Sequence, residues 1–298
     1  MPLTLRQQWG EVVTTNLRNK LITRNMFNSN YQRDAASGAI MIPIVEDLTA
    51  RNYNRGNITN NTIGYDSNKW IQCVIDKDVY LKELIDGYEA GALPYDVLKV
   101  KLERAGYSFA KAMDLHGLQT LIYGAQGLDK NGNAFTQTDP RYDANSSYGI
   151  VKVITAADDV YDIVTDLGGD LSDRGVPEDG RYLAVNGKFK ARILQSNKAI
   201  RQGQLSQELV LKGVLAEIAG FEVYSSGNVT GTDASGNHID AIAGHADFAT
   251  RVEAFATLPE VVNAGGSAYA VGGVFVNGRY VFTHEVTNPK AFGLIVHA

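Results

Sequence analysis

The longest regular pattern in this 298-residue sequence is a run of helical spacing over Leu93–Gly124. Pro94 suits the first turn of a helix, Asp96 suits its positive N-terminal end, and the run stops on a glycine. Between these ends, apolar residues recur mostly at intervals of three and four: Val97, Leu98, Leu102, Ala105, Phe109, Ala112, Met113, Leu118, Leu121 and Ile122. Thirty or so residues at ~1.5 Å each predict a rod of about 45 Å. Because this is too long for an ordinary helix of a compact domain, we expect a strut that spans the molecule.

The segment between residues 45 and 70 has little to bury. It lies between two strand-like runs, Ala39–Val45 and Trp70–Ile75, and it is rich in Asn, Thr and Gly. Alternation over Ile58–Tyr65 predicts an extended hairpin rather than coil. A hairpin that is polar on both faces is not stable alone, so it needs a partner surface. This is the first indication of a protein that assembles.

The first 34 residues are basic, although the chain as a whole is acidic. They hold five basic and two acidic residues, which gives 5 − 2 = +3 within a chain of net charge −5. The basic residues are Arg6, Arg18, Lys20, Arg24 and Arg33. Apolar residues at roughly helical spacing predict one or two short amphipathic helices. Two interpretations stay open: helices packed on their own domain, or an arm that reaches a neighbouring chain or a polyanion.

From about residue 150 the pattern changes to mixed helix and strand. Helices are expected over Thr155–Gly168, with Thr155 as the N-cap, and over Gly187–Ser196. Strands are expected where apolar residues run together or alternate: Arg181–Val185, the second part of Glu217–Thr230, Ile239–Ala243, Val252–Leu258, Tyr269–Phe275 and Tyr280–Thr287. The apolar run Phe292–Val296 at the C-terminus is expected inside a sheet, against the usual fraying of chain ends.

Composition excludes several classes of protein. One cysteine excludes a disulfide framework and a cysteine-built zinc site. The mild net charge of −5 excludes a generally basic nucleic-acid coat. The sequence has no apolar run of about 18 residues and no signal-peptide core, so we expect a soluble chain with no membrane partner.

The sequence also lacks the common catalytic motifs. G-x-S-x-G, G-x-x-x-x-G-K-[ST] and H-E-x-x-H are all absent. Cys73 lies in an apolar run, where a free cysteine behaves as a small hydrophobe. We therefore expect no enzyme, no catalytic residue and no cofactor.

Two patterns resemble metal sites only weakly. Two imidazoles and two carboxylates of a type that suits zinc fall close together: His238, Asp240, His245 and Asp247. On a strand, the second pair would need a specific bend to join the first. Asp129–Asn133 resembles the start of a calcium loop, but Ala134 stands where glycine is needed and Pro140 where glutamate is needed. We expect turns and surface contacts at both places, and no metal.

Taken in order, the chain reads as a basic arm, a polar hairpin, a strut helix, a mixed α/β region and returning strands. This order resembles the major capsid proteins of tailed bacteriophages with the HK97-like fold. Four blocks carry the likeness: IPIVEDLTARNYNRGNITNNTIGYDSNKWIQCVIDKDVYLKELID (Ile42–Asp86), LPYDVLKVKLERAGYSFAKAMDLHGLQTLIYG (Leu93–Gly124), the runs DGRYLAVNGKFKARILQS, LKGVLAEIAGFEVYSSGNV and IDAIAGHADF within Asp179–Phe248, and the ending GRYVFTHEVTNPKAFGLIVHA. They look like the family's extended loop, spine helix, axial strand–helix pattern and closing strands. The likeness covers nearly the whole chain, and its weight comes from the order of the blocks.

The resemblance implies an α+β chain with the HK97-like capsid fold and five parts. Residues 1–35 would form the N-terminal arm, and residues 36–90 the extended β-hairpin loop with flanking peripheral strands. Residues 91–150 would form the long spine helix of the peripheral domain and its linker. Residues 151–243 would form the axial α/β domain, and residues 244–298 the returning strands of the peripheral domain.

The family builds shells, so the resemblance implies copies that assemble into hexamers and pentamers of an icosahedral bacteriophage head around double-stranded DNA. The implied partners are further copies of the chain, a portal protein, a separate scaffolding protein, a possible decoration protein, and packaged DNA held by weak non-specific contact. The sequence shows no long acidic helical N-terminal extension of the kind expected for a fused scaffolding domain, so the resemblance implies a separate scaffolding protein or no scaffold. The implied location is the virion capsid, after assembly in the bacterial host cytoplasm.

In this interpretation the extended loop lies over a neighbouring subunit and is held by backbone pairing and charge pairs. The expected inter-subunit contacts are Arg51, Arg55, Asp66, Lys69 and Trp70, and the inward arm would carry Arg6, Arg18, Lys20 and Arg24. Two alternatives stay open. One is an encapsulin-like compartment shell, and the other is a metal-dependent enzyme built on the two imidazoles and two carboxylates described above.

Overall fold

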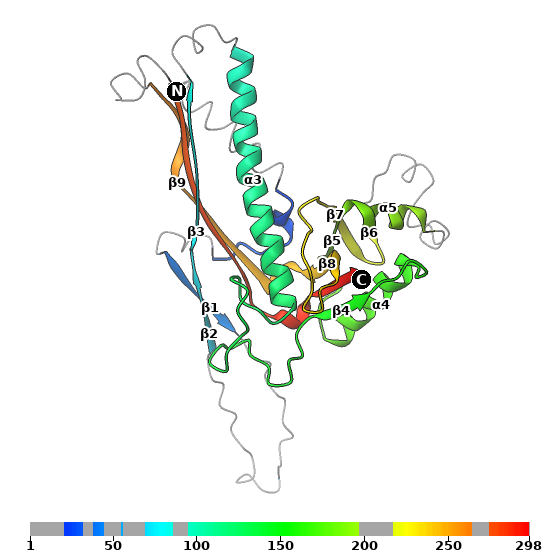
Figure 1. Cartoon of the computed structure of the whole chain (residues 1–298). Helices are drawn as coiled ribbons and strands as arrows, with labels where there is room; N and C mark the ends of the chain where they lie inside the picture. The colour runs from blue at the N-terminus through cyan, green and yellow to red at the C-terminus, as the bar shows by residue number, and fades with distance from the viewer. Residues whose placement is uncertain are drawn as a thin grey trace.

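The computed structural model describes residues 21–31, 38–44, 55, 69–85, 95–196, 217–263 and 274–297. In these residues a long helix runs beside a long three-stranded sheet, and a two-stranded pair lies near one end of that sheet (Figure 1). A six-stranded sheet with two shorter helices forms the other side of the molecule. The expected α+β class is therefore confirmed. None of the described helices is long and apolar enough to cross a membrane.

The expected strut is helix α3, which spans Tyr95–Ala125 and has 31 residues. At ~1.5 Å per residue it is about 46 Å long, and it follows the long sheet in Figure 1. Its apolar residues at three- and four-residue spacing are buried along one side, as the pattern predicts: Phe109, Met113, Leu118, Leu121 and Ile122.

Helix α3 packs on a sheet of order β3 (Lys77–Ile85), β10 (Val274–Val286) and β9 (Ala249–Asn263), all antiparallel. The ring centroids of Phe109 and Tyr280 are 6.1 Å apart across this contact. Near the end of the helix, a Cβ added to Gly124 would lie 2.7 Å from Cγ2 of Val286 on β10. The missing side chain of this glycine lets the helix approach the strand closely.

Strands β1 (Ala39–Ile44) and β2 (Lys69–Val74) pair antiparallel, close to the two expected runs. Their side chains alternate between a buried and an exposed face, as in a sheet covered on one side. The buried face packs with Val252 of β9, which fixes the pair on the long sheet.

The six-stranded sheet has the order β4 (Ile150–Val153), β11 (Gly293–His297), β8 (His238–His245), β5 (Arg181–Val185), β7 (Phe221–Ser225) and β6 (Glu217–Ile218). Strand β11 pairs parallel with β4 and antiparallel with β8. The expectation that the apolar C-terminal run enters a sheet is confirmed, because its residues from Leu294 to Val296 are fully buried.

Helices α4 (Val160–Asp173) and α5 (Gly187–Gln195) belong to the same side of the molecule. The expected N-cap of the first helix was wrong. Asp159 caps α4 by accepting a hydrogen bond from the Tyr161 amide at 3.0 Å. Thr155 instead donates its amide and hydroxyl to Asp158, at 2.8 and 2.7 Å, which holds it in a loop before the helix. A carboxylate one turn later thus replaces the hydroxyl as the cap.

Residues 21–31 lie between α3 and β9 and are packed into the chain itself. The short 3-10 helix η1 (Thr23–Asn25) begins there, and Thr23 donates its amide and hydroxyl to Asp114 of α3 at 3.0 and 2.8 Å. Met26 and Phe27 are buried in the main core, together with the end of α3 and the six-stranded sheet. This part of the predicted arm therefore packs against its own chain.

Candidate assembly surface and the contacts that hold it

The exposed face of the β1–β2 pair is mostly apolar. It carries Met41, Pro43, Trp70 and Val74, which we call the outer face, together with the polar Gln72, the register partner of Met41. Met41 is 53% exposed, Trp70 48% and Val74 44%. Large apolar side chains gathered on one exposed face mark an interaction surface more often than scattered ones do. Tryptophan is also a frequent anchor of protein interfaces.

The opposite face of the same pair is fixed firmly to the long sheet. Ile40, Ile42, Ile71 and Cys73 pack together with Val252. Burial raises the pKa of the Cys73 thiol to about 11, so the thiol stays protonated and acts as the small hydrophobe expected from the sequence. The outer face is thus presented by a rigid support.

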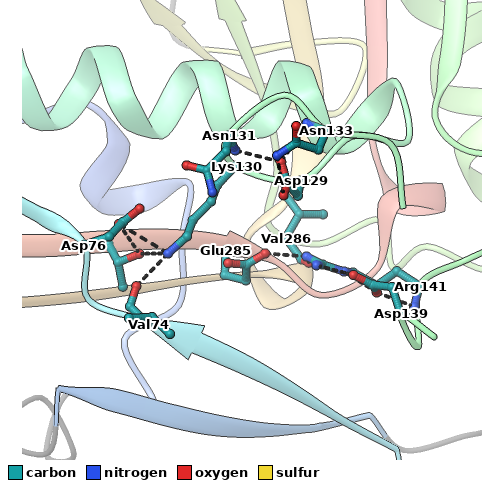
Figure 2. Close-up of polar contacts among 11 residues, drawn as sticks. Val74, Asp76, Asp129, Lys130, Asn131, Asn133, Asp139, Arg141, Glu285 and Val286 are labelled. Carbon is teal, nitrogen blue, oxygen red and sulfur yellow. Dashed lines mark hydrogen bonds and ion pairs between the residues drawn. The ribbon is translucent and has the colours of Figure 1, made fainter. Parts of the chain in front are cut away.

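A lysine from the loop after α3 ties the end of β2 to the long sheet (Figure 2). Lys130 donates from Nζ to the Val74 carbonyl at 2.6 Å and to Oγ1 of Thr283 on β10 at 3.0 Å. The same Nζ lies 3.2 Å from Oδ1 of Asp76. One largely covered ammonium therefore connects β2, Asp76 just before β3, and β10.

An arginine from the linker holds the end of β10 from the other side. Arg141 donates to both carboxylate oxygens of Asp139, to the Val286 carbonyl and to Glu285 (Figure 2). Its guanidinium also lies 4.4 Å from the centroid of the Phe135 ring. The side chains of Arg141 and Glu285 are 7% and 5% exposed. Burial raises the pKa of Glu285, and Arg141 acts against this rise. The pair is therefore a buried ionic contact in which each partner depends on the other.

The predicted turn at Asp129–Asn133 is confirmed. The carboxylate of Asp129 is used in hydrogen bonds within this turn. Oδ1 of Asp129 accepts the amides of Asn131 and Asn133 at 2.9 and 2.8 Å, and Gly132 has φ of +84°. These hydrogen bonds form an Asx turn that places Lys130 against the long sheet (Figure 2).

Two histidines meet where α3 crosses β10. The Nδ1 atoms of His116 and His284 are 2.9 Å apart, and neither Nε2 atom has a hydrogen-bond partner in the described part of the chain. Burial lowers the pKa of His116 to about 4 and that of His284 well below its ordinary value. Both rings are therefore neutral at neutral pH, and one donates its Nδ1 hydrogen to the other.

This pair predicts an acid-sensitive contribution to stability. Between pH 6.5 and about 4 the unfolded chain binds a proton at His116 that the folded chain does not, so stability is lost as pH falls through this window. Over that range we expect the free energy of unfolding of the wild type to fall by on the order of 3 kcal/mol more than that of His116→Gln. Urea unfolding of the unassembled chains at several pH values measures the difference. A difference that does not change with pH would show that His116 does not titrate differently on unfolding. The comparison with the variant is needed because burial also raises the pKa values of Asp114 and Glu285, which act in the opposite direction.

Comparisons with known proteins agree with this architecture. No family model matches the sequence, and no curated protein matches it. Solved structures do match: a chain of Mycobacterium phage Che8 is 15% identical with a TM-score of 0.65, over 92% of this chain and 90% of its own. The capsid structure of cyanophage P-SCSP1u is 16% identical with a TM-score of 0.65, over 88% and 84%. The virus-like particle from Pyrococcus furiosus is 10% identical with a TM-score of 0.55, over 98% and 100%.

The chain has the HK97-like capsid fold. The matches cover nearly all of both chains, so the likeness concerns the whole architecture and not one lobe.

Within the HK97-like fold, the predicted contact residues of the extended loop fall in different places. Lys69 and Trp70 lie on β2 and are exposed, and Trp70 belongs to the outer face. Arg55 is exposed, while Arg51 and Asp66 lie outside the described residues. Of the predicted arm residues, Arg24 is exposed in η1, and Arg6, Arg18 and Lys20 lie outside the described residues.

Sequence reasoning missed the residues that support the outer face. Lys130 and Arg141 lie in a polar stretch of the sequence, and Met41 lies within the strand-like run Ala39–Val45, so none of the three stands out from its neighbours. Alternation in β1 was a usable signal for Met41, because Ile40 and Ile42 on either side of it are buried. No sequence signal pairs Arg141 with Glu285, since 144 residues separate them.

The four candidate metal ligands do not converge. His238 and Asp240 lie at the start of β8, whereas His245 ends that strand and Asp247 follows it. Eight residues of strand place the two histidines about 23 Å apart. In the described part of the chain, no three His, Cys, Asp or Glu side chains gather into a metal site.

Proposed function

We propose that this chain is the major capsid protein of a tailed bacteriophage, assembling into the hexamers and pentamers of an icosahedral head around double-stranded DNA. The observation that carries the proposal is the match to the cyanophage capsid over 88% of this chain and 84% of that one. A shell subunit works through lateral surfaces rather than a pocket, and the apolar outer face on a rigid support suits that role.

The proposed contact is the outer face of one subunit against a neighbouring subunit. Trp70 supplies the aromatic anchor, and Met41 adds adaptable apolar surface beside it. Lys69 and Arg55 would supply charged contacts at its rim. The 1–35 arm, the portal, a separate scaffolding protein, decoration proteins and the packaged DNA belong to this proposal, as does the virion location.

The assembly prediction is tested by changing the outer face. The expressed wild-type chain is expected to form closed shells, tubes or capsomers in negative-stain microscopy. Met41→Ser with Trp70→Ser is expected to leave a folded chain that sediments as a small species, because the apolar contact is lost. Tyr107→Ser on α3, which changes an aromatic residue that is 56% exposed, is the matched control. A wild-type chain that stays a small monomer at high concentration would contradict the proposed function itself. Shells formed equally well by the double variant would contradict only the outer face.

The burial of Met26 and Phe27 determines how many residues an informative arm deletion can remove. Removing residues 1–30 would take Met26 and Phe27 out of the main core, so the loss of particles would report misfolding. Removing residues 1–20 keeps Met26, Phe27 and the other described residues of that core in the chain. We expect such a chain to remain folded and to be impaired in assembly or packaging, as measured by particle yield and DNA content.

An encapsulin-like compartment shell is the second candidate, and what favours it is that this fold also occurs in a virus-like particle from Pyrococcus furiosus, which is not named as a phage capsid. The contents of natively produced particles distinguish the two functions. Packaged double-stranded DNA supports a phage head, and an enclosed protein without DNA supports a compartment.

A further inference from the structure

Two histidines face each other at one end of the six-stranded sheet. His238 begins β8 and His297 ends β11, and they are register partners. Their ring centroids are 5.5 Å apart, with 34° between the ring planes. The other three histidines of the chain are already engaged: His116 pairs with His284, and His245 contacts the Asp179 carbonyl and the Asp247 amide.

A β-bulge creates this juxtaposition. Ile295 pairs with Ala241, but the next residue, Val296, pairs with Ile239, so Asp240 is an extra residue in β8. In an unbroken ladder, His297 would lie opposite Ile239 instead of His238. Bulges commonly redirect side chains beside functional sites.

The extra residue also orients one of the rings. Oδ2 of Asp240 lies 2.7 Å from Nδ1 of His297, and Oδ1 accepts a hydrogen bond from Nδ2 of Asn186 at 2.7 Å. Asp240 is only 5% exposed, and Asn186 is itself fixed as the N-cap of α5. A neutral His297 donates Nδ1–H to this carboxylate, which leaves the lone pair on Nε2. A carboxylate behind an imidazole in this way is the usual support of a metal-binding histidine.

We propose that His238 and His297 bind a divalent first-row transition metal ion, with Asp240 as the positioning residue for His297. An imidazole nitrogen binds zinc at about 2.1 Å, so each ring centre would lie about 3 Å from the ion and two tetrahedrally placed rings about 5 Å apart. The observed 5.5 Å fits this arrangement. Water completes the coordination, because no third ligating side chain converges there in the described residues. The sequence alone paired His238 with the wrong histidine, since His297 is 59 positions away.

Copper(II) is the best probe, because it binds imidazole sites most tightly among these ions. Titrating the untagged full-length chain with Cu²⁺, followed by calorimetry and electron paramagnetic resonance, is expected to show one equivalent per chain with hyperfine splitting from two nitrogens. His238→Ala and His297→Ala are each expected to abolish that equivalent. Asp240→Asn is expected to weaken the affinity about 10- to 100-fold without changing the stoichiometry.

Two controls separate binding from folding. His238 is exposed, so His238→Ala keeps the fold, and circular dichroism checks this directly. Ser235→Ala alters an exposed side chain in the turn before β8 and is expected to leave Cu²⁺ affinity unchanged. The absence of a saturable equivalent, or an affinity that His238→Ala or His297→Ala leaves unchanged, would overturn the proposal. The site belongs to a single chain, so this result does not depend on whether shells form.

Discussion

Replacing Arg141 with methionine is expected to destabilise the unassembled chain by about 3–5 kcal/mol. The change leaves the carboxylate of Glu285 buried without its partner, and Asp139 and the Val286 carbonyl also lose their donor. The pKa of Glu285, already raised by burial, rises further without Arg141. A group whose pKa is higher in the folded chain contributes stability at low pH and loses it as pH rises. The difference in unfolding free energy between the wild type and Arg141→Met is therefore expected to shrink as pH falls from neutral toward the ordinary Glu pKa of 4.5.

Urea unfolding measures this loss, and two further variants test its cause. Arg141→Met with Glu285→Leu is expected to recover much of the stability, because an apolar pair can replace a buried ion pair. Arg279→Met is the matched control, since its pair with Asp78 is a largely exposed contact between neighbouring strands and should change stability little. A double variant as unstable as Arg141→Met would show that packing around the guanidinium, and not the unpaired carboxylate, carries the effect.

Gly124→Ala is expected to destabilise the chain by about 2 kcal/mol, although alanine is the better helix former by about 1 kcal/mol. The added Cβ would lie 2.7, 2.9 and 3.0 Å from Cγ2, Cβ and Cγ1 of Val286. No rotation of Val286 relieves the contact, because its own Cβ is among the three atoms. Either α3 or β10 must shift, at the point where the long helix reaches the core.

Gly169→Ala is the matched control, with the opposite expected sign. Gly169 lies inside α4, and a Cβ there would meet nothing within 4 Å. We expect a gain of about 0.5–1 kcal/mol from helix propensity alone. Urea unfolding compares the two variants, and a double-mutant cycle of Gly124→Ala with Val286→Gly, which removes all three contacted atoms, tests the contact. Additive effects in that cycle would contradict a clash between these two residues.

Local patterns predicted the elements well where one face is buried. The spacing in α3 and the apolar run of β5 gave nearly correct bounds, because burial imposes a visible period. Strand β3, by contrast, was not predicted, because its sequence KDVYLKELI also fits a helix and only pairing with β10 makes it a strand. Caps were less predictable, since Thr155 and Asp159 both offer good capping oxygens.

The candidate sites were less predictable than the elements. Trp70 was named from its residue type and proximity to the loop, and it does lie exposed on β2. The supporting contacts of Lys130 and Arg141 are long-range, and composition carries no information about which distant carboxylate each one meets. The pairing of His238 with His297 additionally depends on a one-residue bulge, which shifts the ladder by one position and has no sequence signature here.

The position of β11 has a consequence for how the protein is made. Strand β4 ends at residue 153, but its partner in the described sheet begins at residue 293, so the sheet closes only when that later segment has been synthesised. At ribosomal rates of about 5–20 residues per second, β4 waits on the order of ten seconds for its neighbour. Until then Phe292, Leu294 and the other buried residues of the closing segment are missing from the core. A growing chain therefore cannot complete the six-stranded sheet until residues 293–297 have been synthesised.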